Sequence, residues 1–242
     1  MDILIITGGS KGIGKALAAK YASKNYNVFS LARSVAKTDK INEFSVDLSD
    51  LTAIQEAFFL IFKELEKIEV SSITLINNAG RLGEIAPLEK LKVEDISKTI
   101  LVNTTVPLIL SSLFIKHTLY LNCKKQIINI SSGAAIKAYE GWSVYCSSKA
   151  AMDMMTKTIA AEQNLLKNTV KVMGIYPGVV DTSMQQQIRN TPKSNFKNLQ
   201  RFVNLKENNE LYTPDFVAAA IYKIDTESLL KNGDIFDIRN LY

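Results

Sequence analysis

The sequence contains little cysteine and histidine, which bears on every site that those residues build. Its 242 residues include two cysteines, Cys123 and Cys146, and one histidine, His117. Two scattered cysteines are too few for a disulfide framework or a metal-binding knuckle, and one histidine is too few for a histidine-based metal site or triad. We therefore expect no metal. We interpret His117 as a helix-surface residue, because it lies in a stretch with an apolar helical period.

Long hydrophobic runs are missing as well. Charged residues break each apolar segment well before the roughly 20 residues that a membrane-spanning helix needs. The chain begins with the apolar run Ile3–Ile6 and a glycine loop, without the basic region and cleavage site of a signal peptide. The sequence thus predicts a cytoplasmic protein without a membrane partner.

Positive charge exceeds negative charge only modestly, with a formal net charge of +5. The lysines are spread along the chain in short clusters such as Lys124-Lys125, whereas nucleic-acid-binding proteins gather them on one face. We therefore expect no nucleic-acid partner. A basic surface of this kind also suits a cofactor that carries phosphate groups.

Strand-like and helix-like segments alternate along the chain, and no repeat or linker divides it. Short β-rich runs predict strands at Ile3–Thr7, Asn27–Leu31, Glu43–Val46, Ile73–Ile76, Gln126–Ile130, Val170–Tyr176 and Asp234–Ile238. Apolar periods predict helices at Gly12–Lys24, Asp50–Lys67, Glu94–Asn122 (one helix or two), Ser143–Lys167 and Thr213–Asp225. This order is typical of an α/β, doubly wound parallel sheet (Rossmann fold) of about seven strands, with helices on both faces. We expect one domain over residues 1–242.

One segment, Met184–Leu211, departs from this alternation. It is polar, rich in asparagine and glutamine, and lacks a clear period. Two interpretations stay open: a mobile lid over the substrate, or a disordered surface loop.

The first predicted strand runs into the glycine-rich segment TGGSKGIG at residues 7–14. Gly8 permits a tight turn, Gly12 lets the backbone approach a pyrophosphate, and Gly14 allows close packing of helix on strand. The following helix offers free N–H groups to phosphates at its N-terminus. This position after a strand and before a helix predicts a dinucleotide site.

The end of the second predicted strand indicates which dinucleotide. A site for NAD usually places an acidic residue there, but this chain has Arg33 and Ser34. An arginine suits the 2′-phosphate of NADP(H), and Lys11 and the Ser34 hydroxyl would assist it. The alternative is a surface arginine without this role.

Further motifs resemble the short-chain dehydrogenase/reductase family. The glycine loop fits TGxxxGxG, residues 77–80 fit NNAG, residues 145–149 fit YxxxK, and Ile130-Ser131-Ser132 ends the fifth predicted strand. The resemblance implies a catalytic set of Ser132, Tyr145, Lys149 and Asn103. It implies cofactor contacts at Gly8, Ser10, Lys11, Gly12, Ile13, Gly14, Arg33, Ser34, Asp47, Leu48, Asn78, Ala79, Gly80, Tyr145, Lys149, Pro177, Gly178, Val180, Asp181, Thr182 and Met184.

Carbonyl reduction explains why these residue types belong together. Hydride transfer leaves negative charge on the carbonyl oxygen, which Ser132 would stabilise and Tyr145 would protonate. Free tyrosine titrates near ~10, and a lysine four residues later on a helix shares its face. Lys149 would therefore favour tyrosinate and lower this pKa. By resemblance, Lys149 also holds the nicotinamide ribose and Asn103 supports a water-mediated proton relay. Ser131 would be a helper or form a strand-end hydrogen bond.

Three stretches, 75–83, 129–146 and 181–186, resemble the sepiapterin reductase and benzil reductase subgroup. The resemblance implies substrate contacts at Ser132, Tyr145, Gly178, Trp142, Met184 and Asp237. Asp237 corresponds to an aspartate that anchors the pterin in sepiapterin reductases, or else it caps a strand or pairs with a surface base. Trp142 forms a pocket wall, or has a core or interface role. The resemblance implies that the substrate is a ketone on a pterin side chain or an aromatic α-diketone.

The sequence thus predicts an NADPH-dependent carbonyl reductase that acts on a small molecule. The alternative is a regulatory protein that senses NADPH without turnover. The resemblance implies a homodimer or homotetramer, although the apolar lengths Leu101–Leu121 and Val144–Ile159 equally suit burial on the sheet.

Overall fold

The inner strands are buried on both faces, as their runs of branched apolar residues require. The computed structural model describes residues 1–34 and 41–241. In β1 (Asp2–Thr7), β2 (Asn27–Ala32), β4 (Ser72–Asn77) and β6 (Lys171–Tyr176), every residue after the first is buried. Continuous burial of this kind is typical of a parallel sheet that is covered on both sides.

The strands form one seven-stranded sheet in the order β3-β2-β1-β4-β5-β6-β7, and every pairing is parallel. The other strands are β3 (Ile41–Ser45), β5 (Lys124–Ile130) and β7 (Ile235–Asp237). The strand order reverses between β1 and β4, and such a switch point forms a crevice at the carboxyl ends of the strands. The predicted doubly wound α/β fold is confirmed.

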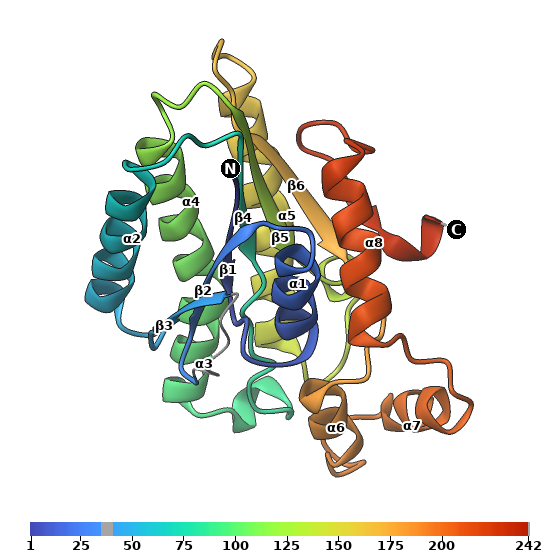
Figure 1. The fold of residues 1–242 in the computed structure, drawn as a ribbon. Helices are drawn as coiled ribbons and strands as arrows, with labels where there is room; N and C mark the ends of the chain where they lie inside the picture. Colours follow the sequence, from blue (N-terminus) through green and yellow to red (C-terminus); the bar gives the residue numbers. More distant parts are fainter. Residues whose placement is uncertain (35–40, 242) are drawn as a thin grey trace.

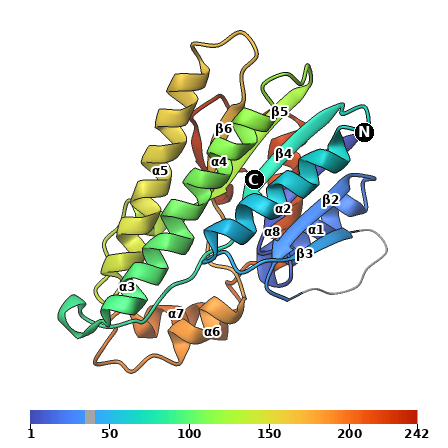
Figure 2. The same cartoon turned by 90° about the vertical axis from the view of Figure 1, so that its left-hand side faces the viewer.

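Helices cover both faces of the sheet (Figures 1 and 2). On one side, α1 (Gly12–Ala22) packs against α8 (Pro214–Thr226). On the other side lie α2 (Leu51–Leu65), α4 (Val106–His117) and α5 (Ser143–Gln163). Each face has its own cluster of buried apolar side chains, so the sheet separates two halves of the core.

Two of these helices begin at capping residues that the sequence shows directly. The Asp50 carboxylate accepts hydrogen bonds from the backbone N–H groups of Thr52 and Ala53, at 3.0 and 3.1 Å. Thr213 accepts from the backbone of Phe216 at 3.2 Å, and Pro214 occupies the first turn of α8. These caps satisfy donors that have no partner inside the helix.

The long apolar helical segment divides into three parts. It consists of α3 (Val93–Ile100), a π-helical turn at Leu101–Thr105, and α4. The segment Val93–His117 has a mean hydropathy of 1.5 and is long and apolar enough to cross a membrane, by length and composition alone. Its side chains Val106, Leu110 and Phe114 belong to the core cluster, as expected of a core helix. His117 is exposed at the end of α4 and stacks on Phe62, which agrees with its predicted surface position.

The polar segment 184–211 is not a disordered loop, and that interpretation was wrong. It contains α6 (Ser183–Arg189) and α7 (Leu199–Glu207), which lie together at the bottom of Figure 1. Phe196 and Phe202 in this segment are buried in an apolar cluster with Trp142. The lid stays a prediction. Single-turn 3₁₀ helices occur at Leu88–Lys90, Gly133–Ala135 and Ile238–Asn240.

Candidate active site

The glycine loop between β1 and α1 has the geometry of a phosphate cradle. Gly8 and Gly12 adopt left-handed backbone conformations with φ of +72° and +56°, which favour glycine. A Cβ atom on Gly14 would lie 2.2 Å from the carbonyl oxygen of Gly8, so no side chain fits there. The loop therefore lets a ligand approach its backbone at the N-terminus of α1.

The NNAG motif joins the ends of β1 and β4. The Thr7 hydroxyl accepts hydrogen bonds from the backbone N–H groups of Asn78 and Ala79, at 3.1 and 3.0 Å. The Asn78 side chain donates to the carbonyl oxygen of Thr7 at 2.9 Å. These bonds fix the edge of the crevice at the point where the strand order reverses.

A cleft of about 750 Å³ lies along the glycine loop and the ends of β2 and β3. The predicted cofactor residues that line it are Gly8, Ser10, Lys11, Gly12, Ile13, Gly14, Arg33, Ser34, Asp47, Leu48, Asn78, Ala79, Gly80, Thr182 and Met184. The size suits a dinucleotide, and the glycine cradle suits its pyrophosphate. The residues present therefore fit a nicotinamide dinucleotide.

The other predicted cofactor residues lie elsewhere. Tyr145, Lys149, Pro177, Gly178 and Val180 line a second, adjoining cavity. Asp181 lies outside both linings, and its carboxylate is 2.6 Å from Lys206 Nζ. Ile13, Asn78, Gly80, Thr182 and Met184 line both spaces, so the cleft leads into the second cavity.

Asp47 has a fixed orientation at the far end of the cleft. Its carboxylate accepts hydrogen bonds from the backbone N–H and hydroxyl of Ser49, at 2.9 and 2.8 Å. These bonds lower the pKa of Asp47, so it is ionised at neutral pH.

The second cavity brings together the predicted catalytic side chains. Tyr145 and Lys149 are one turn apart on α5, and Lys149 Nζ lies 5.8 Å from the centre of the Tyr145 ring. The Lys149 ammonium donates to the backbone oxygen of Ile130 at 2.8 Å. Ser132, at the end of β5, forms a hydrogen bond with Tyr145. Serine, tyrosine and lysine thus meet at the carboxyl edge of the sheet.

Burial dominates the protonation of this pair. It raises the pKa of Tyr145 to about 12, and the hydrogen bond with Ser132 offsets only part of this rise. It lowers the pKa of Lys149 to about 8, although the negative charge of Asp153 opposes the change. The predicted fall in the tyrosine pKa is therefore not seen for these residues, because desolvation disfavours tyrosinate more strongly than its neighbours favour it. A neutral tyrosine beside a charged lysine is the state that can donate a proton.

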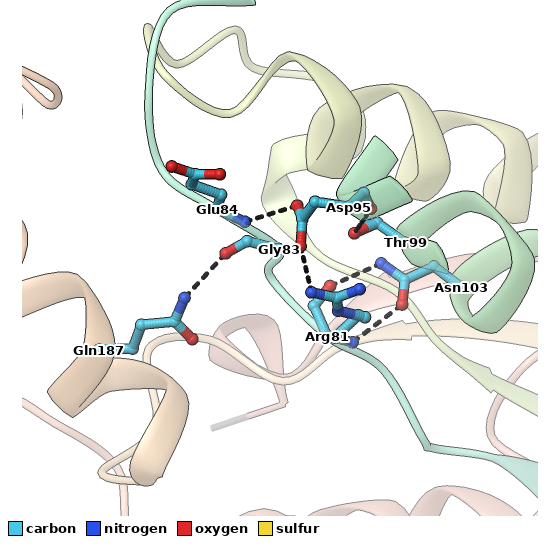
Figure 3. Close-up of polar contacts among 7 residues, drawn as sticks. All are labelled: Arg81, Gly83, Glu84, Asp95, Thr99, Asn103 and Gln187. Atoms are coloured by element: carbon cyan, nitrogen blue, oxygen red, sulfur yellow. Dashed lines mark hydrogen bonds and ion pairs between the residues drawn. The ribbon is translucent and has the colours of Figure 1, made fainter. Parts of the chain in front are cut away.

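Asn103 is buried in the π-helical turn and is held by the loop that follows β4 (Figure 3). Its side chain accepts from the backbone N–H of Arg81 at 2.9 Å and donates to the Arg81 oxygen at 2.8 Å. A Cβ on Gly80 would lie 3.5 Å from Asn103 Oδ1 and 3.7 Å from Lys149 Nζ. Asn103 and Lys149 therefore both approach Gly80, and Asn103 is not in the wall of either cavity.

The two serines at the end of β5 have different partners. Ser131 donates to the buried carboxylate of Asp153 at 2.5 Å, and Tyr176 binds the other oxygen of that carboxylate. Ser132 remains next to Tyr145. This difference agrees with Ser131 as a strand-end hydrogen-bond donor.

All predicted substrate residues line the second cavity, which has a volume of about 200 Å³. They are Ser132, Trp142, Tyr145, Gly178, Met184 and Asp237. Trp142 is both a cavity wall and a core residue, because its ring also stacks on Phe196 with 5.0 Å between centroids. We name this space the substrate cavity.

Asp237 lies in the substrate cavity, but its carboxylate already has a partner. Both carboxylate oxygens accept hydrogen bonds from Arg239 Nε, at 2.9 and 3.0 Å, and Nη2 of the same residue forms an ion pair with it. Burial favours the neutral acid, but these bonds lower the pKa of Asp237. A pterin would have to compete with Arg239 for this carboxylate.

Several lining residues were not predicted from the sequence. Tyr139, Arg201, Phe202 and Arg239 line the substrate cavity, and Lys98 lines the cofactor cleft. Aromatic residues within the polar segment 184–211 were the available signal for an ordered wall. Within residues 1–34 and 41–241, no group of three or more histidine, cysteine, aspartate or glutamate side chains could hold a metal ion.

The fold and this site define the class of protein. The chain belongs to the short-chain dehydrogenase family, whose model, described as short chain dehydrogenase, matches residues 2–193. It is 38% identical over 243 residues to a benzil reductase ((S)-benzoin forming) of Bacillus subtilis (strain 168), covering 99% of each chain. It is 31% identical over 213 residues to sepiapterin reductase of Rattus norvegicus, covering 78% of each chain. The protein is therefore an oxidoreductase that interconverts carbonyl and alcohol groups.

Solved structures agree with this assignment. A 4-hydroxyisoleucine dehydrogenase mutant complexed with NADH and succinate superposes with a TM-score of 0.81 at 28% identity, covering 97% of this chain and 96% of the other. ElxO with NADP bound gives a TM-score of 0.80 at 25% identity, with 98% and 96% covered. A nicotinamide cofactor is typical of this family, and these neighbours bind either form of it.

Proposed function

We propose that the protein is an NADPH-dependent reductase of aromatic α-diketones. The choice of diketones over pterins rests on Asp237, because both of its carboxylate oxygens already accept hydrogen bonds from Arg239. A pterin anchor needs a carboxylate that is free to accept N–H bonds. The aromatic walls Tyr139, Trp142 and Phe202 suit a flat apolar substrate, and the full-length similarity to benzil reductases supports the same class.

The choice of NADPH rests on the end of β2. Arg33 and Ser34 follow this strand directly, where an NAD site usually has a carboxylate, and both line the cofactor cleft with Lys11. Arginine binds phosphate through charge-assisted hydrogen bonds. The neighbour that contains NADP shows that this fold accepts the phosphorylated cofactor in a related protein.

The side chains at the inner end of the cavity explain the reduction. A dihydronicotinamide held in the cleft would supply the hydride, which leaves negative charge on the carbonyl oxygen of the substrate. Ser132 stabilises this oxygen with a hydrogen bond, and Tyr145 gives it a proton. Lys149 provides positive charge next to Tyr145 and would hold the ribose of the cofactor. Asn103, which approaches Gly80 as Lys149 does, would support a water that returns a proton to Tyr145.

The test compares initial rates of NADPH oxidation with benzil-type diketones and with sepiapterin-like pterins. We expect rapid diketone reduction that Asp237→Asn changes by less than about threefold, since rim ion pairs contribute little. A strong pterin preference that collapses in Asp237→Asn would instead establish pterin reduction. Tyr145→Phe should abolish turnover and keep NADPH affinity, whereas an NADPH sensor without turnover would show no diketone reduction before or after the change.

A further inference from the structure

The outer end of the substrate cavity is positively charged. Arg201 on α7 and Arg239 on the last 3₁₀ helix both line it, and Lys149 lies at the inner end. Among the described lining residues, Asp237 is the one carboxylate. Since Asp237 and Arg239 neutralise each other, the charge of Arg201 is left unbalanced at the outer end.

Arg201 is oriented by an aromatic residue rather than by an acid. Its Nη1 donates to the Tyr139 hydroxyl at 2.8 Å, and its guanidinium lies 5.5 Å from the centre of the Phe202 ring. In the part of the chain that the structure describes, it forms no ion pair within 4.0 Å. Among the described residues, no acceptor is bound by the remaining N–H groups of Arg201, by Nη1 of Arg239 or by the Tyr139 hydroxyl hydrogen, so these groups are available as donors at the same rim.

These donors suit a carboxylate. Planar guanidinium groups match its geometry, and charge-assisted hydrogen bonds are about twice as strong as neutral ones. A neutral diketone would leave this charge without a partner.

A row of aromatic rings leads from this rim to Tyr145. The Tyr139 ring lies 4.8 Å from the Trp142 ring, which lies 5.7 Å from the Tyr145 ring, measured between centroids. The Trp142 indole therefore contacts both the ring whose hydroxyl binds Arg201 and the ring of the proposed proton donor. A flat aryl ring beside this indole would direct one substituent towards Tyr145 and the opposite one towards Arg201.

We propose that Arg201, with Tyr139 and Arg239, binds a carboxylate on the substrate, and that the preferred substrates are aryl ketones or diketones with an acidic group across the ring from the carbonyl. This inference rests on the proposed diketone reduction and narrows its substrate class. It requires no change in the catalytic chemistry at Tyr145.

Matched substrates test the inference. Benzil, 4-carboxybenzil and the methyl ester of 4-carboxybenzil differ in charge at the outer ring but share the dicarbonyl group. We expect kcat/KM for the acid to exceed that for the ester by about 10-fold at low salt, and to fall towards it as ionic strength rises. Arg201→Gln should remove this preference by lowering kcat/KM for the acid to about the value for the ester. Lys193→Gln, an exposed charge change on the same segment outside the cavity lining, should preserve the preference.

Binding provides a second readout that does not depend on turnover. Trp142 is the single tryptophan of the chain and lies between the two ends of the cavity, so its fluorescence reports on ligands there. The acid should quench this fluorescence at about 10-fold lower concentration than the ester in the NADPH-loaded protein, and at equal concentration in Arg201→Gln.

The outcomes separate the two proposals. Equal kcat/KM for the acid and the ester, together with equal quenching, would overturn the anion site. Rapid reduction of benzil in the same experiment would still support the proposed function. If no diketone is reduced, the proposed function fails, and the quenching of the acid against the ester then decides the anion site alone.

Discussion

The surroundings of Lys149 shift the pKa of this residue in a way that bears directly on catalysis. It is buried on α5, donates to the backbone of Ile130, and approaches the Tyr145 ring. Burial lowers the pKa of Lys149 to about 8, which places its titration just above neutral pH. The ammonium is therefore the main form at pH 7, and small changes above that pH remove the charge next to the proton donor.

This gives a pH prediction. Reduction should be fastest below pH 8 and should decline as pH rises through about 8, because Lys149 loses its proton. Lys149→Met should lower kcat by at least about 100-fold, whereas Lys157→Met, on the exposed side of the same helix, should have little effect. Steady-state rates between pH 6 and 10 measure this. If the decline persists at the same pH in Lys149→Arg, another group causes it.

Arg33 is the residue that we expect to distinguish NADPH from NADH. It lines the cofactor cleft at the end of β2 and is exposed. Arg33→Ala should raise KM for NADPH by about 10-fold and leave KM for NADH nearly unchanged, because only NADPH has the 2′-phosphate. Lys15→Ala, an exposed position on α1 outside the cleft lining, provides the control. Equal changes in KM for NADPH and NADH would show that Arg33 does not bind the 2′-phosphate.

At the scale of elements, the loop after β4 connects the catalytic helix turn to α6 (Figure 3). Arg81 holds Asn103 through its backbone and forms an ion pair with Asp95 on α3. Asp95 also accepts from the backbone of Glu84 at 2.8 Å, and Gln187 on α6 donates to the Gly83 oxygen at 2.8 Å. The loop is thus fixed from both sides, and the position of Asn103 depends on it.

Asp95→Ala should therefore act on catalysis from outside the cavity. We expect kcat to fall by about 10-fold because the loss of the ion pair frees Arg81, whose backbone holds Asn103. KM for NADPH should change less, since Asp95 lies outside the cofactor cleft and Arg81 is the one residue of its side-chain contacts that lines it. Glu94→Ala removes an exposed acid from the same turn and should leave kcat unchanged. An equal loss of kcat in both variants would point to the helix as a whole, and an unchanged kcat in Asp95→Ala would mean that Asn103 is held without this carboxylate.

The elements also show where the sequence was informative. Strand and helix positions followed from apolar runs and caps, and most boundaries fell within a few residues. The edge strand was predicted at Glu43–Val46 but is Ile41–Ser45, because an edge strand is only partly buried and its pattern is weak. Helix α7 was missed because tertiary contacts of Phe202 with Trp142, rather than a local period, hold it in place.

At the scale of the whole molecule, motifs located the catalytic set but not the outer cavity. Ser132, Tyr145 and Lys149 are close in sequence, so spacing and helix geometry were sufficient to bring them together. Arg201 and Tyr139 are about 60 residues apart and meet only because α7 folds back over the cavity. Arg239, the partner of Asp237, is only two residues away in sequence, yet its contact with both carboxylate oxygens depends on the turn of the last 3₁₀ helix. The predicted homodimer or homotetramer stays a prediction.

A buried polar cluster joins the two ends of the chain on the α1–α8 side. The Asp225 carboxylate, 2% exposed, accepts from the Tyr21 hydroxyl at 2.6 Å and from Thr74 at 3.3 Å, and Gln126 also donates to it. Lys124 Nζ lies 3.7 Å from the same carboxylate. One buried charge thus connects α1, α8, β4 and β5. Its stability depends on every one of these donors, because an unsatisfied buried carboxylate is costly.

Tyr21→Phe removes one of these donors and no apolar volume. It should lower the free energy of unfolding by about 1–3 kcal/mol, seen as a lower midpoint in urea, with NADPH affinity unchanged because Tyr21 is at the end of α1 away from the glycine loop.

Burial and Asp225 raise the pKa of Tyr21 well above its usual value, so native Tyr21 stays neutral where the unfolded residue ionises. Wild-type stability should therefore fall as pH rises above about 10, and this slope should be weaker in Tyr21→Phe. Tyr120→Phe, at a side chain that is 90% exposed, should change neither quantity. Equal midpoints for Tyr21→Phe and Tyr120→Phe would mean that other donors satisfy Asp225 in full.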